Sequence, residues 1–194
     1  MFPRSYQVDP SGLVCSVTVT FRQGDRLCAR ALVLLDVKRG DIGSTSQAYA
    51  DAYLDPASPL AERLSQARRP LLWLGGGARG ASAAVQRLVK MGWAVVSSVQ
   101  GRGILAEDHP ASLGSYNLQK PSEAFYQTVD ALLVVGSRLR SNETLTYKLG
   151  LPATRYRIDA NPLAENRGYE SELFVRGDAQ LTLDALADRL EGRM

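Results

Sequence analysis

The period of the hydrophobic positions changes along the chain near residue 66. Residues 15–21 place an apolar side chain at every second position, which is typical of a strand with one face in water. Beyond residue 70, short and wholly apolar runs such as 131–135 alternate with segments of helical period. This alternation predicts an α/β fold, with a doubly wound, Rossmann-like parallel sheet in the carboxyl-terminal part.

The individual elements follow from the same pattern. In the carboxyl-terminal part we expect strands at 71–74, 94–99, 131–135, 156–159 and 173–175, and helices at 81–91, 121–127 and 181–190. In the amino-terminal part we expect a turn at 9–12, strands at 15–21 and 31–36, and helices at 44–54 and 60–69. The prolines between 55 and 70 favour two parts, a partial α/β segment at 1–65 and the main domain at 66–194.

The strand ends of the main domain carry glycine or aspartate. Gly75, Gly76 and Gly77 follow the first of its strands, and a glycine lets backbone N–H groups approach a diphosphate closely. A parallel sheet binds its ligands at the carboxyl ends of its strands, so these turns predict a crevice there. The triplet lacks the full spaced dinucleotide fingerprint, and a plain strand-to-helix turn remains the alternative.

Composition excludes several classes of function. The 23 Lys and Arg and 20 Asp and Glu residues are spread along the chain, which argues against a nucleic-acid partner. No apolar run approaches a membrane span and no secretory signal is visible, so we expect no membrane partner and a cytoplasmic location. Cys15 and Cys28 form no Cys-x-x-Cys pair, and His109 is the only histidine. A zinc site, a redox dithiol and any mechanism with two imidazoles are therefore not expected.

Six stretches of the chain resemble the central domain of thiamine-diphosphate-dependent enzymes of the acetolactate synthase and 2-oxo acid decarboxylase group. They occur in the family's order within about residues 66–192. These stretches are Arg69–Ala78, Val99–Pro110, Ser112–Gly114, Asp130–Leu139, Arg157–Asp159 and Val175–Ala179. The resemblance implies a Rossmann-like sheet of six strands that binds FAD or ADP in some members and no nucleotide in others.

The resemblance also implies which residues lie nearest such a nucleotide. Carried over by position, they are Gly75, Gly76, Gly77, Gly136, Ser137, Arg138, Asp159, Gly177 and Asp178. Glycine amides would bind phosphate, Arg138 would supply the countercharge and Asp159 would accept a ribose hydroxyl. Many members have a second acid two positions after Asp159, where this chain has Asn161. A scaffold without a nucleotide is the alternative.

The motif that holds thiamine diphosphate in this family is absent. Members bind the cofactor and its Mg²⁺ through Gly-Asp-Gly and a later Asn, and a Glu of the amino-terminal domain activates the cofactor. Asp25, Asp41 and Asp178 each follow a glycine, but none of them precedes one. No metal site is therefore expected, and the chain alone should not decarboxylate or condense 2-oxo acids.

The amino-terminal part carries a second resemblance. Residues 34–54, within the segment 31–60, are similar to the catalytic segment of orotidine 5′-phosphate decarboxylase, whose signature is Asp-x-Lys-x-x-Asp. By this match Lys38 would donate the proton to the carbanion, flanked by Asp36 and Asp41. No lysine precedes Lys38 to serve as the family's other catalytic lysine, and only about one strand-loop-helix unit of the barrel is present.

These observations lead to one main hypothesis and two alternatives. The main hypothesis is a central domain, scaffold or nucleotide-binding, of a thiamine-diphosphate enzyme whose other domains or subunits are its partners. The alternatives are an orotidylate decarboxylase-like fragment that uses Lys38 and a free-standing FAD- or ADP-binding module. The sequence leaves open whether the chain forms a homo-oligomer. The resemblance changes from one family to the other near residues 55–66. This change has two candidate origins, a genuine short gene product or a reading frame that joined two unrelated genes.

Overall fold

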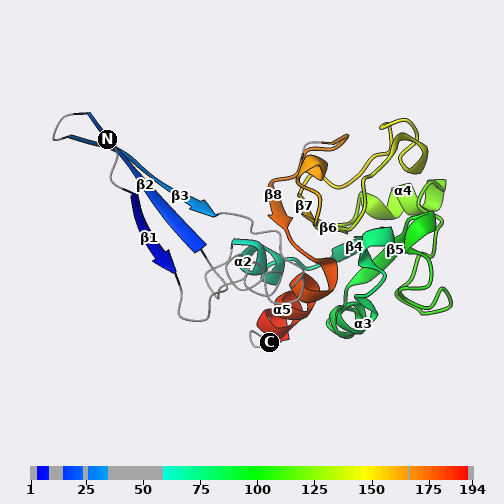
Figure 1. Cartoon of the computed structure of the whole chain (residues 1–194). Coiled ribbons are helices and arrows are strands. Elements are labelled where there is room, and N and C mark those ends of the chain that lie inside the picture. Colours follow the sequence, from blue (N-terminus) through cyan, green and yellow to red (C-terminus); the bar gives the residue numbers. More distant parts are fainter. Residues whose placement is uncertain (1–3, 9–14, 24–25, 35–58, 166, 192–194) are drawn as a thin grey trace. The chain divides into compact units, whose positions relative to one another are not determined.

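The computed structural model describes residues 4–8, 15–23, 26–34, 59–165 and 167–191, and side chains from residue 60 onward. The chain divides into two compact units, Met1–Ser46 and Gln47–Met194 (Figure 1). No helix among the described residues is both long and apolar enough to cross a membrane.

The first unit contains an antiparallel sheet of three strands. Its strands are β1 (Arg4–Val8), β2 (Cys15–Gln23) and β3 (Arg26–Leu34), in the order β1-β2-β3. The strand expected at 15–21 lies within β2, and β3 contains the first part of the strand expected at 31–36. β1 was not expected. The turn at 9–12, the helix at 44–54 and the candidate residues Asp36, Lys38 and Asp41 lie outside the described residues.

The second unit is built on a parallel sheet of five strands in the order β5-β4-β6-β7-β8. This confirms the expected α/β fold. The strands are β4 (Pro70–Leu74), β5 (Ala94–Ser97), β6 (Ala131–Val135), β7 (Arg155–Asp159) and β8 (Leu173–Arg176). The helices are α2 (Pro59–Ser65), α3 (Ser82–Lys90), α4 (Lys120–Tyr126) and α5 (Ala179–Glu191).

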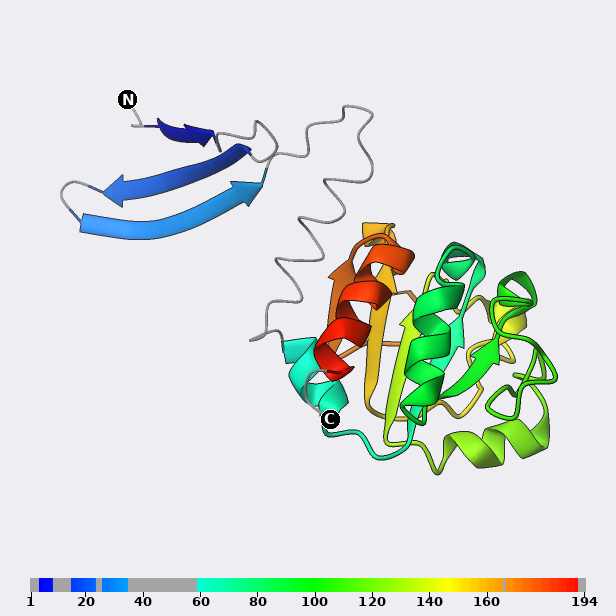
Figure 2. The same ribbon diagram turned by 90° about the horizontal axis from the view of Figure 1, so that it is seen from below.

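Both faces of this sheet are covered, as uniformly apolar strands require. Alternate strand residues such as Leu72, Leu74 and Leu133 form one core with side chains of α2, α3 and α5. The remaining strand residues, such as Trp73 and Val134, form a second core with α4 and the loops beside it. Figure 2 shows α3 and α5 lying together on the first face. Ala84, Val85 and Leu88 of α3 are buried there and Met91 packs against them, as their spacing predicted.

The sixth strand implied by the family resemblance is reduced to a single bridge. Ser112 pairs with Val95 beside the edge strand β5, in parallel orientation. Val95 donates its N–H to the Ala111 carbonyl and accepts one from Leu113, at 2.8 and 2.7 Å. Gly114, with φ +59°, turns the chain away directly afterwards. The backbone position of a sixth strand is therefore occupied, but only over a few residues.

Two of the expected elements end earlier than their pattern suggested. α2 ends at Ser65, because the N–H groups of Arg68 and Arg69 donate to the Asp130 carboxylate at 2.7 and 3.0 Å. β5 ends at Ser97, and residues 99–101 form a short 3-10 turn. Bonds to a distant part of the chain follow the end of α2, whereas the turn after β5 contains a local bond from the Gly101 N–H to the Ser98 carbonyl at 2.9 Å.

Candidate functional site

The carboxyl ends of all five strands lie along one edge of the parallel sheet, so their turns share one rim. The chain runs from β4 outward to β5 and then returns to place β6 on the other side of β4. The turns after β4 and β6 therefore meet at the point where the strand order reverses. Ligand crevices of open α/β sheets form at such points.

The glycines of these two turns are in direct backbone contact. Gly75 donates its N–H to the Val135 carbonyl at 2.9 Å, and Gly77 donates to the Gly136 carbonyl at 3.0 Å. A Cβ on Gly75 would lie 2.2 Å from the Gly136 oxygen. A Cβ on Gly136, whose φ is +57°, would lie 2.6 Å from the Gly77 carbonyl carbon. These positions need glycine because the two turns touch.

This contact changes how the glycine triplet can meet an anion. The N–H groups of Gly75 and Gly77 already donate within the protein. Gly76 is the member of the triplet whose N–H is not taken by another described backbone group. Within the triplet, only the Gly76 N–H would thus be free of a described backbone acceptor and able to donate to an anion.

A cleft of about 480 Å³ lies beside these turns. It brings together five of the residues that the sequence placed near a nucleotide, and adds five that it did not. The lining residues are Gly76, Gly77, Arg79, Ser98, Gln100, Gly136, Ser137, Arg138, Arg140 and Glu143. This volume lies within the ~300–1,000 Å³ that is usual for small-molecule sites.

The charge of the cleft is positive, with three arginines against the single carboxylate of Glu143. Arg79 is held by Gln100, donating from Nε to its backbone oxygen at 3.2 Å and from Nη2 to its Oε1 at 3.4 Å. Glu143 accepts the backbone N–H of Arg140 at 3.4 Å. Arg138 is exposed to solvent. The arrangement is suited to an anion that carries more than one charge.

The other predicted site residues lie farther along the same rim and do not line the cleft. Asp159 accepts the N–H of Asn161 through Oδ1 at 2.8 Å. Gly177 donates its N–H to the Asp159 carbonyl at 3.2 Å. Asp178 accepts the N–H of Leu181 at 3.1 Å, at the start of α5. Each of these groups has a structural partner at the end of β7 or β8.

Sequence reasoning missed Arg79, Ser98, Gln100, Arg140 and Glu143. Arg79 and Gln100 lie in glycine turns that the pattern had marked as strand ends, so their position was detectable although their role was not. Arg140 and Glu143 lie in the loop after β6, whose path the sequence pattern does not determine. A short 3-10 turn at Ser141–Glu143 brings both into the cleft.

The described residues do not suit a magnesium-bound diphosphate. No group of three or more His, Cys, Asp or Glu side chains in the described part of the chain could hold a metal ion. The sequence also lacks a Gly-Asp-Gly segment. The described residues therefore offer no grouped ligands for the Mg²⁺ of a bound diphosphate, and the charged groups of the cleft are mainly arginines.

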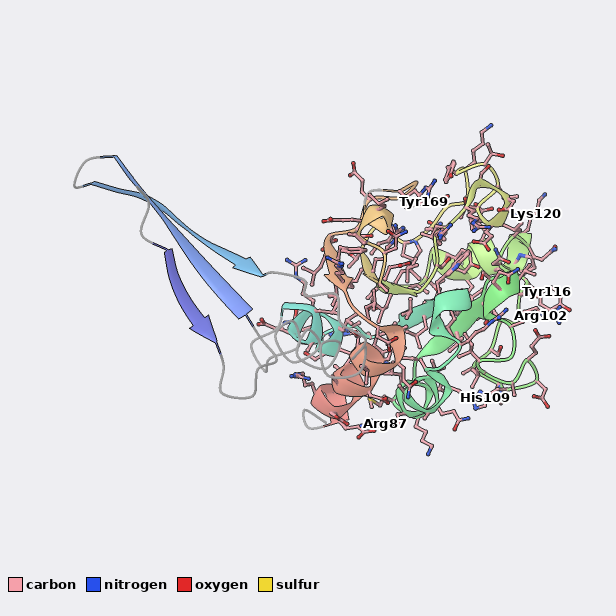
Figure 3. All side chains as sticks on the ribbon, viewed as in Figure 1. Arg87, Arg102, His109, Tyr116, Lys120 and Tyr169 are labelled. Carbon is pink, nitrogen blue, oxygen red and sulfur yellow. The ribbon has the colours of Figure 1, made fainter. Side chains whose placement is uncertain are left out.

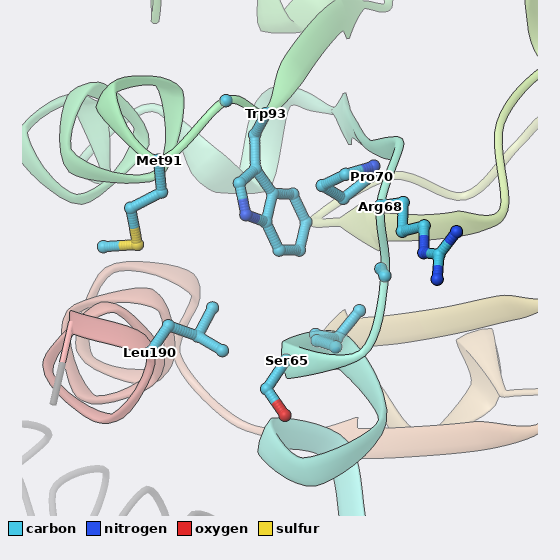
Figure 4. A pocket seen from close by; sticks show the side chains of 9 residues that line it. Ser65, Arg68, Pro70, Met91, Trp93 and Leu190 are labelled. Atoms are coloured by element: carbon cyan, nitrogen blue, oxygen red, sulfur yellow. The ribbon is translucent and has the colours of Figure 1, made fainter. Parts of the chain in front are cut away.

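Two further features lie outside the cleft. His109, labelled in Figure 3, accepts the N–H of Ala111 through Nδ1 at 3.1 Å, so it stabilises the loop after β5. A pocket of about 190 Å³ lies among Leu64, Met91, Trp93 and Leu190, at the ends of α2, α3 and α5 (Figure 4). It borders Pro70, the first residue of β4, and Trp93, which directly precedes β5, at the edge of the sheet opposite the rim that carries the cleft.

Comparison with known families identifies the fold. Residues 57–186 match the family model of the thiamine pyrophosphate enzyme central domain. The chain belongs to the family of thiamine pyrophosphate enzyme central domains. The matched residues include α2, all five parallel strands and the cleft, so it is the central domain of these enzymes that carries the candidate site.

The chain is also similar to individual thiamine pyrophosphate enzymes. The chain is 36% identical over 131 residues to a probable 2-ketoarginine decarboxylase of Pseudomonas aeruginosa, which covers 67% of this chain and 23% of that protein. It is 31% identical over 160 residues to a pyruvate oxidase of Lactiplantibacillus plantarum, which covers 75% of this chain and 26% of that protein. The chain thus spans about a quarter of the length of these thiamine pyrophosphate enzymes.

A short match of another kind is also present. Over 33 residues the chain is 94% identical to the orotidine 5′-phosphate decarboxylase of a Nocardioides strain. This match covers 17% of this chain and 12% of that protein. It agrees with the second resemblance found in the sequence.

Proposed function

We propose that this chain is a central domain that binds a nucleotide in its arginine cleft and serves as a scaffold for the other domains or subunits of a thiamine pyrophosphate enzyme. The observation that carries the proposal is the position of the cleft. It lies at the reversal of strand order, has three arginines, and has a floor of glycine turns in backbone contact. These are the conditions under which α/β sheets bind phosphate groups.

The roles of the residues follow from their chemistry. The Gly76 N–H and the Ser137 hydroxyl would donate to the diphosphate, and Arg138 with Arg140 would neutralise it. Gln100 holds Arg79 at the other wall of the cleft. Asp159 lies on the same rim, where it would accept ribose hydroxyls. Bound FAD would supply redox chemistry, while bound ADP would serve structure alone.

The domain by itself would not act on 2-oxo acids. The cofactor that performs this chemistry in the family has no binding motif in the chain, and the described residues offer no metal ligands in a group. We infer that activity requires the cofactor-binding domains supplied by other parts of the enzyme.

The proposal is tested by calorimetric titration of the purified chain with ADP, FAD and NAD. We expect binding of ADP or FAD, and we expect Arg138→Gln to weaken it about tenfold or more, because one charge-assisted contact contributes ~1.5–3 kcal/mol. Arg68→Gln removes an exposed arginine at the opposite edge and is the matched control, with binding expected within about twofold of the unmodified chain.

The outcomes separate the alternatives. Absence of binding by all three nucleotides, or equal loss in both variants, would leave only the scaffold role. Tight binding that is unchanged when the missing cofactor domains are added would favour a free-standing nucleotide module.

A second candidate function, orotidylate decarboxylation through Lys38 with Asp36 and Asp41, is favoured by the short match of 94% identity. Its three residues lie outside the described part of the chain. An unchanged ultraviolet absorbance of orotidylate after several hours with the purified chain would eliminate it.

A further inference from the structure

Arg157 is a fully buried arginine whose hydrogen-bonding capacity is only partly used. It lies in the middle of β7, with none of its surface exposed to solvent. Its Nη1 donates to the Ala164 and Arg167 carbonyls. Its Nε and Nη2 have no acceptor among the described residues. Burial lowers the pKa of this guanidinium, because the charged form loses its hydration.

Nε and Nη2, the two unused nitrogens of Arg157, are the atoms through which other arginines of this protein bind carboxylates. Arg87 donates from Nε and Nη2 to the two oxygens of Glu191 at 3.0 and 2.7 Å. Arg102 uses the same two nitrogens for Glu107, at 2.5 and 2.8 Å. This fork matches the spacing of two oxygens in a carboxylate or a phosphate. In Arg157 the fork is intact but has no described partner.

A third unused donor lies on the same face of the sheet. The Nε1 of Trp73 is buried and has no described acceptor. Trp73 pairs with Val134 and Val134 pairs with Arg157, so the three residues stand at one level on adjacent strands. Residues at this level therefore carry three buried donor nitrogens without a described acceptor. An oxyanion has several lone pairs and would satisfy donors of this kind.

The loop from β6 to β7 has a strained backbone beside this arginine. Leu139, Leu145, Thr146 and Tyr147 have φ between 45° and 61°, a region that residues with a Cβ rarely adopt. The ring of Tyr147 lies against Gly168, where a Cβ would be 2.7 Å from its Cε1. Gly168 follows Arg167, whose carbonyl accepts from Arg157. The strained loop thus meets the segment that Arg157 holds.

We propose that Arg157 and Trp73 form a latent oxyanion-binding site that opens when the β6–β7 loop leaves its left-handed conformation. The ligand is a single carboxylate or phosphate group. The site is distinct from the nucleotide cleft, because neither Arg157 nor Trp73 lines that cleft. Opening relieves the strained backbone, and the anion then satisfies the guanidinium fork. The two gains act together to favour the open, occupied state.

Inorganic phosphate is the probe, and the indole N–H resonances of the whole ¹⁵N-labelled chain are the readout. The chain has two tryptophans, so only two such signals are expected, and the Trp93→Phe variant assigns them. We expect phosphate at about 20 mM to shift the Trp73 signal and leave the Trp93 signal in place, as a site of millimolar affinity would. Failure of the Trp73 signal to move would overturn the proposal.

Two substitutions make the test specific. Arg157→Lys keeps the charge but removes the fork, and should weaken phosphate binding about tenfold. Thr146→Gly removes strain from the closed loop, and should weaken binding about fivefold while raising the unfolding temperature. If Arg157→Lys does not fold, Thr146→Gly still decides, because unchanged affinity in that variant contradicts the opening of the loop.

Phosphate bound in the nucleotide cleft is distinguished by the Arg138→Gln variant. A Trp73 shift that is lost in this variant and kept in Arg157→Lys would assign the phosphate to the cleft and would overturn the proposal. Loss of the shift in Arg157→Lys together with its persistence in Arg138→Gln supports the latent site, whatever the outcome of the nucleotide titrations.

Discussion

Gly136 shows how one backbone atom can decide the geometry of the rim. Its left-handed φ and its contact with Gly77 leave no space for a Cβ. We expect Gly136→Ala to lower the free energy of unfolding by about 3–5 kcal/mol, because backbone strain and a clash between two backbones add. Urea denaturation measures this change.

Gly103 provides the matched control for that substitution. It also has a positive φ, of +81°, but a Cβ there would have no neighbour within 4 Å. Gly103→Ala should therefore cost only ~1 kcal/mol, the strain alone. Equal losses in the two variants would contradict the role of the contact between the turns.

At the scale of residues, the sequence predicted several positions that meet at the rim, but not the backbone contact between their turns. Gly76, Gly77, Gly136, Ser137 and Arg138 do meet in one cleft, because strand ends of a parallel sheet share an edge. The structural use of the Gly75 and Gly77 amides was not foreseeable. It depends on contact with the turn at Gly136, which lies about 60 residues farther along the chain. A local sequence pattern does not predict such a contact.

At the scale of elements, α3 and α5 are joined by two ion pairs at the surface. Arg87 of α3, labelled in Figure 3, contacts Asp188 and Glu191 of α5 at 2.6 and 2.7 Å. The hydrogen bonds from Arg87 lower the pKa of Glu191 below its ordinary value. A lowered folded-state pKa gives stability that is present above the unfolded-state pKa and is lost as the pH falls through the folded-state pKa.

This linkage predicts a difference in acid stability. Between about pH 6 and pH 3, the unfolding temperature of the unmodified chain should fall more than that of Arg87→Gln, in which Glu191 has an ordinary pKa. Thermal scans monitored by circular dichroism measure it, with Arg68→Gln as the control variant. Parallel curves for Arg87→Gln and the unmodified chain would show that the pair adds nothing.

The elements that the sequence predicted correctly are those with a uniform apolar pattern. β6 was expected at 131–135 and has those bounds, because all five of its side chains are buried. The end of α2 and the single-residue bridge at Ser112 depend on partners far along the chain. Hydrophobic period describes which face is buried, and it does not describe which distant groups compete for a backbone N–H.

At the scale of the whole molecule, the chain consists of two compact units. The described cores of the second unit draw their members from Leu60 to Leu190. We therefore expect a variant that lacks residues 1–46 to fold and to unfold within about 2 °C of the full chain. Differential scanning calorimetry measures this, and a drop of about 10 °C or more would show that the first unit stabilises the second.

The pocket shown in Figure 4 has a consequence for how this domain is built into larger proteins. Leu64, near the end of α2, and Leu190, near the end of α5, line the same small pocket. The first and last described helices of the second unit, α2 and α5, thus end beside one pocket, on the side of the sheet away from the arginine cleft. A domain whose ends lie close together can be inserted into a surface loop of another protein without separating the strands that flank the loop. The rim with the arginine cleft would then face away from the point of insertion.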